Sequence, residues 1–459
     1  MGFSMKKLWA VLVVLLVELG VRVWGSSVSQ AVIGAKADLK GSMQEKAERE
    51  TFAAPDWSVY HKTDEILDEL RELDETCNHM RLEPAAVPGV DDSEVPLVVV
   101  LGYNVKNRLR EMVSSAFQSK TRIVAVFGEH GRELITSEVA LKVVQDICNG
   151  EGTDAETARD ELQRSEVHLV PVLGASSRRL AEMGEYCERL NSNGVDLNRN
   201  WGFLWGKTDT TTIAEEERPG TEPFSENESR AVKALVESVR PDAFVSVHSG
   251  DKAMLLPWDH RPELPDRDEY EKMGKVAGIV AQEHCESCQI GNVYKLFGYN
   301  AFGTAGDWAF GSAKVPYTYT WEIYGDFSSA RDDCFRMFNP ADQETYNEVL
   351  ANWSTSFFTL AAAIHTANER LNAIPLPKQL ITNGQNRAST PSRRYGFASE
   401  WRRRGQGGIE PLLARSYGVL LLEFMIALMA VFAFTAVALY LRKSASKSTS
   451  RSMEPFKLA

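Results

Sequence analysis

Short apolar runs alternate with longer amphipathic stretches along most of the chain. Five of the runs are rich in β-branched or aromatic residues and are bounded by turn-forming residues, which is typical of buried strands: 95–103, 122–128, 167–173, 242–248 and 316–325. Apolar residues recur at helical spacing in the segments between and around them: 59–77, 134–147, 228–239, 271–284 and 356–371. Strands separated by helices predict an α/β fold, in which helices pack on a β-sheet.

The start of the chain carries a different pattern. Within residues 1–25, two lysines precede an apolar run and small residues follow it, an arrangement typical of a cleaved secretory signal peptide. An uncleaved membrane anchor is the alternative interpretation of this run. Residues 26–56 are then a short N-terminal segment, too short for a folded domain, and 57–371 are expected to form one globular domain.

A second long apolar stretch lies near the other end of the chain. Residues 417–441 contain one charged residue, Glu423, and are long enough for one transmembrane helix. Residues 372–416 are polar and rich in Pro, Arg and Gly, as expected of a stalk, and the basic segment 442–459 is expected to be a cytoplasmic tail. With the signal peptide, this predicts a type I membrane protein of the secretory pathway whose main domain is lumenal or extracellular.

The composition agrees with a globular secretory protein. The 459 residues are 44% hydrophobic and 25% charged, and the net charge of −12 argues against nucleic acid as a partner. Six cysteines suit an oxidising compartment, where an even number indicates disulfides whose pairing stays open. The stretch His-Cys-Glu-Ser-Cys at 284–288 has a second interpretation, in which it forms part of a metal site. Asn227 and Asn352 begin sequons and are candidate glycosylation sites.

Candidate catalytic residues gather where the expected strands end. His130 and Glu133 follow the second expected strand, and His248 ends the fourth. Open α/β sheets collect ligands at such strand ends, and two imidazoles with one carboxylate match a catalytic zinc site. A hydrogen-bonded histidine beside a helix-start glutamate is the alternative for the first pair. Glu322 lies in an apolar strand, where a carboxylate is costly to bury unless it is paired or functional, so it is a candidate general base.

Four separated motifs resemble the zinc carboxypeptidases of the carboxypeptidase A type, in order and at similar intervals: His-Gly-Arg-Glu at 130–133, Gly-Val-Asp-Leu-Asn-Arg-Asn-Trp at 194–201, Val-His-Ser-Gly at 247–250 and Thr-Tyr-Thr-Trp-Glu at 318–322. The resemblance implies one catalytic domain with a mixed, twisted sheet flanked by helices. It also implies one Zn²⁺ ion held by His130, Glu133 and His248, with Glu322 as base and proton shuttle. The implied reaction is hydrolysis of the C-terminal peptide bond of peptides or proteins.

The same resemblance assigns contacts to the substrate. Asn198 and Arg199 match the pair that binds the free C-terminal carboxylate, a role suited to the planar guanidinium. A turn and a surface charge are the alternative interpretation of these two residues. Arg189 resembles the arginine that stabilises the oxyanion, Arg132 resembles one that binds further along the peptide, and Tyr299 resembles the mobile tyrosine that closes over the substrate.

Two further positions bear on substrate preference. Gly306 stands where digestive members of the family carry the residue at the base of the specificity pocket, and glycine selects neither basic nor apolar side chains. Asp259 follows the last zinc histidine in a Pro-Trp-Asp stretch and resembles an aspartate of the regulatory carboxypeptidases that remove Lys and Arg. A loop aspartate that caps its own backbone is the alternative. We expect release of C-terminal Arg or Lys in preference to Phe or Leu.

Two other functions stay open on the sequence. One is an amidase that acts on peptidoglycan or another non-ribosomal peptide. The other is a surface glycoprotein that keeps the fold as a binding module without catalysis. The complete set of candidate ligands and base favours an enzyme over the binding module. The expected partners are therefore peptide or protein C termini as substrates, and a membrane through one C-terminal helix.

Overall fold

A computed structural model describes residues 53–90, 95–106, 120–150, 153–209, 215–329, 333–370 and 377–380. These residues belong to the first of two compact units of the chain, which spans residues 1–395, and the second unit spans 396–459.

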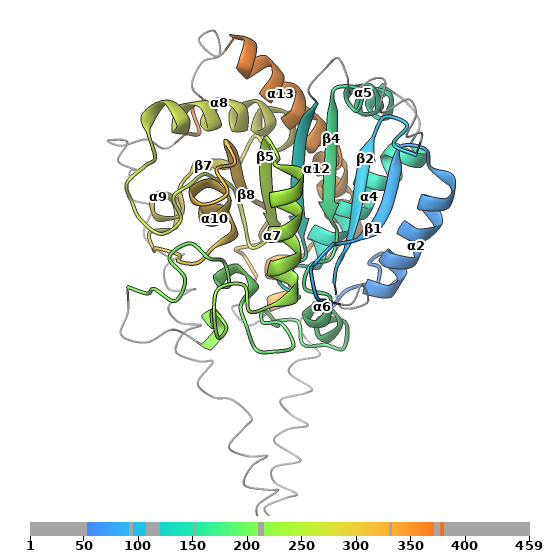
Figure 1. Ribbon diagram of the computed structural model, residues 1–459. Coiled ribbons are helices and arrows are strands. Elements are labelled where there is room, and N and C mark those ends of the chain that lie inside the picture. Colours follow the sequence, from blue (N-terminus) through green and yellow to red (C-terminus); the bar gives the residue numbers. More distant parts are fainter. Residues whose placement is uncertain are drawn as a thin grey trace, which may run out of the picture. The chain divides into compact units, whose positions relative to one another are not determined.

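The described residues contain eight strands, which form one sheet in the order β1-β2-β4-β3-β5-β8-β6-β7 (Figure 1). The strands are Met80–Pro84 (β1), Leu97–Gly102 (β2), Thr121–Phe127 (β3), Ser165–Val170 (β4), Ala243–His248 (β5), Asp251–Leu255 (β6), Gln289–Gly291 (β7) and Tyr317–Tyr324 (β8). The α-helices are Thr63–Thr76 (α2), Leu134–Asn149 (α4), Thr153–Glu161 (α5), Ala175–Glu182 (α6), Asn227–Val239 (α7), Arg267–His284 (α8), Val293–Phe297 (α9), Ala305–Gly311 (α10), Cys334–Phe338 (α11), Gln343–Trp353 (α12) and Ser356–Arg370 (α13). Two 3-10 turns lie at Leu197–Arg199 (η2) and Glu215–Glu217 (η3).

The sheet is mixed, as the family resemblance implies. Its central strands β4, β3, β5 and β8 run parallel to one another, while β2 and β6 join them antiparallel from the two sides. The register places Phe127 of β3 beside Val247 of β5, and His248 of β5 beside Glu322 of β8. Because parallel strands end at the same edge of a sheet, the residues at and after these strand ends come close together.

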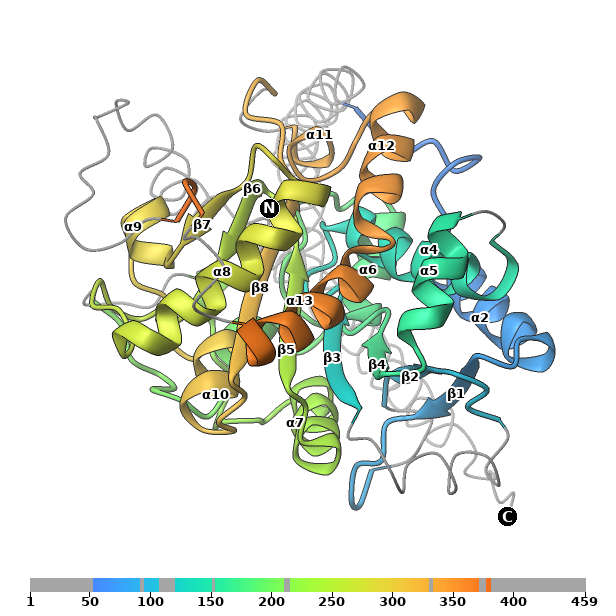
Figure 2. The same cartoon turned by 90° about the horizontal axis from the view of Figure 1, so that it is seen from above.

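Helices cover both faces of the sheet, as Figure 2 shows. Helices α7 and α10 pack on one face, where an apolar cluster includes Val124 and Val126 of β3. Helices α4, α8, α12 and α13 cover the other face, whose cluster includes Ile123, Ala125 and Phe127 of the same strand. Alternate residues of β3 thus enter opposite apolar layers, which explains why the strand is apolar over most of its length.

Among the described residues, the hydrophobic pattern predicts five of the eight strands and five of the eleven α-helices, and it does not predict α5, α6 or α9 to α12. The five expected strands correspond to β2, β3, β4, β5 and β8, and the expected helices correspond to α2, α4, α7, α8 and α13. The pattern does not predict β1, β6 and β7. Strand β1 lies at the sheet edge and keeps most of its side chains partly exposed, β6 begins with two charged residues, and β7 has three residues. None of the three carries the long apolar run that marks a central strand.

All six cysteines form disulfides: Cys77–Cys148, Cys187–Cys334 and Cys285–Cys288. The interpretation of 284–288 as part of a metal site is wrong, because its two cysteines bond to each other. The Cys187–Cys334 bond joins the loop after α6 to the first residue of α11. It thereby limits the movement of a loop that also carries Arg189.

The folded body extends beyond the expected boundary at residue 371. Leu380 is 2% exposed, forms a β-bridge with Ile290 of β7 and packs over Gly274 of α8. Residues 377–380 therefore belong to the body, although a stalk is expected from 372. Among the described residues, no helix is long and apolar enough to span a bilayer. The expected signal peptide, transmembrane segment and tail lie outside the described residues.

Both candidate glycosylation sites lie on helices. Asn227 is the first residue of α7 and accepts a hydrogen bond from Arg230, and Asn352 lies in α12. The serines of the two sequons, Ser229 and Ser354, are buried. Neither sequon thus forms the surface loop that is typical of a glycosylated site.

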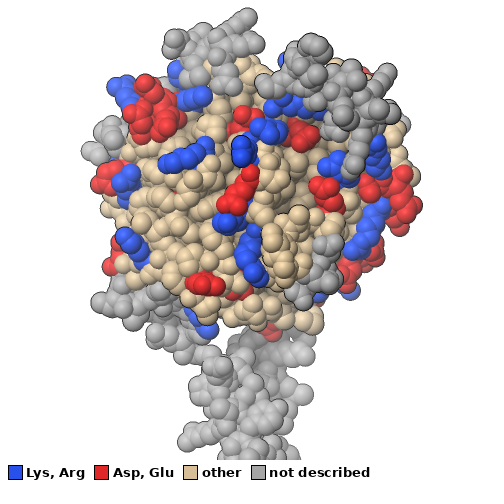
Figure 3. All heavy atoms as spheres, viewed as in Figure 1, with Lys and Arg blue, Asp and Glu red and all other residues tan. Residues whose placement is uncertain are grey.

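The charged surface mixes both signs. On the face shown in Figure 3, Lys and Arg side chains lie next to Asp and Glu side chains, and the described residues of this face gather into no broad patch of one sign. On this face, charges of opposite sign lie next to one another and do not form the single-sign field that would attract a polyanion.

Candidate metal centre and active site

The first candidate ligands lie on the turn between β3 and α4. Gly128 follows β3 with a φ of 63°, a left-handed conformation, and a Cβ at this position would lie 2.7 Å from the Oγ of Ser137. Glycine permits this tight turn, which directs His130 and Glu133 to the carboxyl edge of the sheet. Glu133 is the residue just before α4, where the helix dipole favours a negative charge.

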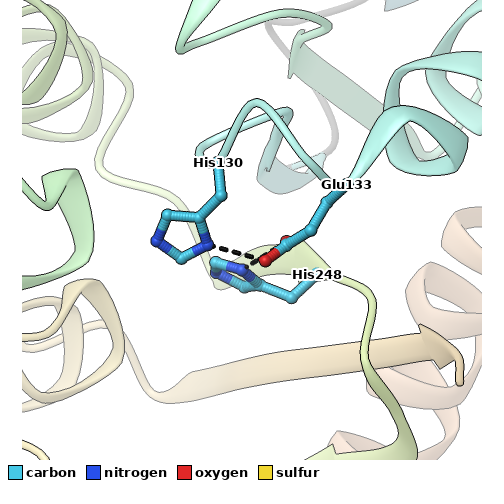
Figure 4. A group of neighbouring side chains, drawn as sticks. All are labelled: His130, Glu133 and His248. Atoms are coloured by element: carbon cyan, nitrogen blue, oxygen red, sulfur yellow. Dashed lines mark hydrogen bonds and ion pairs between the residues drawn. The ribbon is translucent and has the colours of Figure 1, made fainter. Parts of the chain in front are cut away.

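His130, Glu133 and His248 form a compact buried group (Figure 4), in which one ligand atom from each lies within 4.8 Å of the others. The Glu133 carboxylate lies against both rings: Oε1 is 2.8 Å from His130 Nδ1, and Oε2 is 2.9 Å from His248 Nδ1. Burial alone would raise the pKa of Glu133, but the two imidazoles outweigh burial and hold this pKa below its ordinary range.

The group fits a zinc ion. Two imidazole nitrogens and one carboxylate oxygen form a donor set of catalytic zinc sites. Both Nδ1 atoms face the group because the opposite ring nitrogens have partners: His130 Nε2 is 3.1 Å from Asp196 Oδ1, and His248 Nε2 is 2.9 Å from Ser246 Oγ. An imidazole that donates from Nε2 keeps a lone pair on Nδ1, which is the form that binds a metal.

Glu322 lies beside this group, because it is the neighbour of His248 in the β5–β8 ladder. Its Oε2 is buried and has no hydrogen-bond partner among the described residues. Burial raises the pKa of Glu322 to about 8, and the negative charge of Glu133 adds to the rise while His248 opposes it. An unpartnered carboxylate oxygen next to the metal group is suited to accept a proton.

Arg189 reaches the metal group from the loop after α6. Its Nε and Nη2 lie 2.9 and 2.8 Å from Asp196 Oδ2, and its Nη1 is 3.3 Å from His130 Nδ1. Burial would raise the pKa of Asp196, but Arg189 and Arg199 hold it well below the ordinary range. One buried carboxylate therefore orients both a candidate metal ligand and this guanidinium.

Asn198 and Arg199 lie on η2, next to the metal group. The Nδ2 of Asn198 is 3.4 Å from His248 Nε2, and its Oδ1 accepts a hydrogen bond of 2.9 Å from the backbone N–H of Ala305. Arg199 donates from Nη1 to the backbone carbonyl of Asn198 at 2.9 Å and from Nη2 to Glu217 Oε1 at 3.1 Å. The guanidinium of Arg199 thus already holds a carboxylate, which comes from η3.

Arg132 follows His130 by two residues. Its Nη1 is 3.6 Å from Glu216 Oε2, its guanidinium lies 4.4 Å from the centre of the Phe338 ring, and its Nε has no hydrogen-bond partner among the described residues. Like Arg199, it pairs with a carboxylate of η3. Burial lowers the pKa of Arg132, and the positive charge of Arg189 lowers it further.

Tyr299 lies close to the same groups. It is partly buried, and its ring stacks on that of Phe297 with 6.4 Å between ring centres. Burial raises the pKa of the Tyr299 hydroxyl, while the charge of Arg199 opposes the rise and the charge of Glu322 adds to it. The hydroxyl is therefore within electrostatic reach of both the candidate carboxylate clamp and the candidate base.

Asp259 and Gly306 lie side by side. Asp259 is buried, and its Oδ2 accepts a hydrogen bond of 2.7 Å from Thr304 Oγ1. A Cβ at Gly306 would lie 3.1 Å from Asp259 Oδ2 and 3.4 Å from Thr320 Oγ1. The carboxylate thus fills the space next to position 306 instead of capping its own loop. Burial, with the charge of Asp307 as a second cause, raises the pKa of Asp259 to about 8.

The structure brings all the candidate catalytic and substrate-binding residues to one region. Four further carboxylates lie there that the sequence analysis does not select: Glu129, Asp196, Glu216 and Glu217. Asp196 could have been found from its place inside the motif at 194–201. Glu129 has no signal beyond its position before His130, and the acidic run 215–217 is typical of a solvated loop.

A mixed α/β sheet with a His, Glu, His group at the carboxyl edge of its parallel strands is an arrangement suited to a metal-dependent hydrolase. The family model of zinc carboxypeptidases matches residues 98–355, which is more than half of the chain. The chain therefore belongs to the zinc carboxypeptidase family and is a zinc metallocarboxypeptidase.

Individual relatives agree with this assignment. Carboxypeptidase B of Astacus astacus is 24% identical over 323 residues, which cover 65% of this chain and 98% of that protein. Zinc carboxypeptidase A 1 of Anopheles gambiae is 33% identical over 138 residues, and this match covers 29% of this chain and 32% of that relative. The alignment thus covers nearly the whole length of the Astacus protein, but only about a third of the length of the Anopheles protein.

Two solved structures share the fold. The carboxypeptidase A from Helicoverpa armigera matches with a TM-score of 0.55 and 19% identity, over 73% of this chain and 82% of that chain. Bovine thrombin-activatable fibrinolysis inhibitor, in complex with tick carboxypeptidase inhibitor, matches with a TM-score of 0.53 and 17% identity, over 67% of this chain and 98% of that chain. At these identities the matches show the fold alone.

Proposed function

We propose that this enzyme removes single residues from the free C terminus of peptides or proteins and prefers a C-terminal Arg or Lys. The observation that carries the preference is the contact between Asp259 and Gly306. Because glycine has no side chain, the Asp259 carboxylate comes to 3.1 Å from where a Cβ of residue 306 would be and lines the space beside it. A cationic side chain that enters this space meets a buried carboxylate, which an apolar side chain would leave unpaired.

The terminal carboxylate of the substrate binds Arg199, with Asn198 beside it. Support comes from the contact that Arg199 already makes: its Nη2 donates to the Glu217 carboxylate at 3.1 Å. A substrate carboxylate replaces Glu217 and is held by the same planar group. This anchor restricts cleavage to the last residue, because the peptide bond next to a bound C terminus is the one that reaches the metal group.

The remaining residues carry out the hydrolysis. A zinc ion bound by His130, Glu133 and His248 supplies Lewis acidity and lowers the pKa of water. Glu322 accepts a proton from the attacking water and delivers it to the leaving amine. Arg189 donates hydrogen bonds to the carbonyl oxygen as negative charge develops on it.

A release assay tests the proposal. Blocked peptides that differ only in the last residue (Arg, Lys, Phe or Leu) are compared as free acids and as C-terminal amides. We expect cleavage of the free acids, with Arg and Lys released fastest. Asp259→Asn should reduce Arg release at least about 30-fold, the equivalent of the ~2 kcal/mol lost when a buried charge loses its partner. Phe release should change little.

The matched control is Asp242→Asn. Asp242 precedes the first residue of β5, at the end of the strand opposite to His248, so this variant removes one negative charge away from the site. It should leave the ratio of Arg to Phe release unchanged. Equal cleavage of amides would contradict the exopeptidase assignment, and faster release of Phe than of Arg by the unmodified enzyme would contradict the role of Asp259.

We also propose that the enzyme enters the secretory pathway and is held at a membrane through residues 417–441. Its three disulfides support an oxidising compartment. Ending the chain before Tyr417 should convert a membrane-bound enzyme into a secreted, active one. Continued membrane attachment of the truncated chain would point to an uncleaved N-terminal anchor instead.

A further inference from the structure

One buried carboxylate beside the metal group has no part in the chemistry above. Glu129 is 1% exposed and precedes His130 in the turn after β3. Its Oε2 lies 3.0 Å from His248 Nε2 and 3.2 Å from Ser246 Oγ, and its Oε1 lies 3.2 Å from Trp201 Nε1. A carboxylate buried this deeply is costly to the fold unless its partners compensate for the lost water.

We propose that Glu129 is a positioning residue for the second zinc-binding histidine. Its carboxylate accepts the Nε2–H of His248 and so keeps the Nδ1 lone pair directed at the metal. The inference rests on the zinc site assigned above, and it does not depend on which C-terminal residue the enzyme prefers.

The two histidines are then held in the same way. Asp196 lies 3.1 Å from the Nε2 of His130, and Glu129 lies 3.0 Å from the Nε2 of His248. In both rings the nitrogen that faces away from Glu133 meets a buried carboxylate. A carboxylate in this position fixes the tautomer and the ring plane, and it raises the basicity of the nitrogen that binds the metal.

Glu129 is itself fixed from two sides. Trp201 is fully buried, and its indole N–H can only donate, so it holds Oε1 as an acceptor. Ser246 lies on the same face of β5 as His248, and its hydroxyl donates to Oε2. With one oxygen held by the indole, the other is left to face the imidazole.

This arrangement makes an amide a poor replacement. In Glu129→Gln, an NH₂ group replaces either the oxygen that faces Trp201 or the oxygen that faces His248. If the NH₂ faces Trp201, two donors meet. If it faces His248, it favours the tautomer with the proton on Nδ1, which cannot bind zinc. The substitution thus keeps the size of the side chain and removes the property that the proposal requires.

The test measures zinc binding without any substrate. The full chain is loaded with zinc, and the dissociation constant and the rate of zinc loss are measured by competition with a chelator. We expect Glu129→Gln to weaken zinc binding about 10- to 100-fold, the usual effect of removing such an outer partner. The absorption spectrum of the cobalt-substituted variant should also shift, because the geometry at His248 changes.

The matched control is Glu138→Gln. Glu138 is an equally buried glutamate on α4, but its carboxylate contacts Arg178, His61 and Tyr346 instead of a metal ligand. This control should lower the melting temperature without changing zinc affinity. Zinc affinity of Glu129→Gln within about twofold of the unmodified protein would overturn the proposal.

A second variant keeps the proposal falsifiable if Glu129→Gln does not fold. Ser246 is the other acceptor near His248 Nε2, at 2.9 Å. In Ser246→Ala the carboxylate of Glu129 remains, so zinc affinity should stay within about threefold of the unmodified protein. A loss of tenfold or more, in a variant whose crystal structure keeps the contact between Glu129 Oε2 and His248 Nε2, would assign the orientation of His248 to the serine hydroxyl and overturn the role of Glu129.

Discussion

If Asp259 recognises the basic side chain, as we propose, selectivity for Arg over Phe should rise with pH around pH 8, because this carboxyl group titrates there. Asp259 is buried beside Gly306 and has a pKa of about 8. In its neutral form it offers a guanidinium a hydrogen bond without an opposite charge. In its ionised form it offers a full ion pair in a position shielded from water.

The size of the effect follows from the fraction of Asp259 that is ionised. With a pKa of about 8, about 10% is ionised at pH 7 and about 90% at pH 9. The value of kcat/KM reports groups of the free enzyme, so the ratio of kcat/KM for Arg to that for Phe should rise about tenfold over this interval. Arg is the better probe than Lys, because its own charge does not change in this range.

The assay measures both peptides in the same buffers at half-unit steps from pH 6.5 to 9.5. Groups that act on every substrate, such as Glu322, cancel in the ratio, which isolates the contribution of Asp259. The ratio should be flat in Asp259→Asn. A flat ratio in the unmodified enzyme, or a rise that persists in the variant, would refute the reasoning.

Three further predictions concern single carboxylates. Glu322→Gln should bind zinc normally and lose about 10²- to 10⁴-fold in kcat, the range for a general base, and full activity with stoichiometric zinc would contradict its role. Glu217→Gln should lower KM for short peptides about two- to fivefold with little change in kcat, because an ion pair of ~0.5–1 kcal/mol no longer competes for Arg199. Glu216→Gln, which alters the pair with Arg132 instead, is its control and should leave that KM unchanged. Asp259→Asn should also change stability with pH: the pKa of Asp259 is raised from 3.8 to about 8, so its stabilising contribution is complete below about pH 4 and lost as pH rises through 8. The melting temperature of the variant relative to the unmodified protein should therefore increase from pH 5 to pH 9, and a constant difference would contradict the shift.

The metal ligands could be predicted because their positions follow from chain topology. A histidine that ends a buried strand, or follows one across a tight glycine turn, reaches the carboxyl edge of the sheet whatever the rest of the fold does. His130, Glu133 and His248 meet this condition, and the structure brings them together. Strands β1, β6 and β7 could not be predicted in the same way, because edge position or shortness removes the apolar signal.

Glu129 and Glu217 depend on three-dimensional contacts that leave no pattern in the sequence. Glu129 acts, in our proposal, on a histidine of another strand, and nothing in its own segment distinguishes it from a surface glutamate. The pairing of Glu217 with Arg199 likewise joins two turns that are separate in sequence. The resemblance to a family locates Asp259 and Gly306 individually, whereas their contact is visible only in the structure.

The contacts of Asp307 explain how Asp259 could serve in the substrate recognition that we propose for it. Asp307 accepts hydrogen bonds from the backbone N–H groups of Asp259 and His260 and lies 2.6 Å from the His260 ring nitrogen. Asp259 has the Thr304 hydroxyl as its donor. Burial raises the pKa of Asp259, and the negative charge of Asp307 raises it further, while the hydrogen bond from Thr304 opposes the rise. The pair therefore keeps a proton on Asp259 near neutral pH, and a cationic substrate side chain would favour release of that proton.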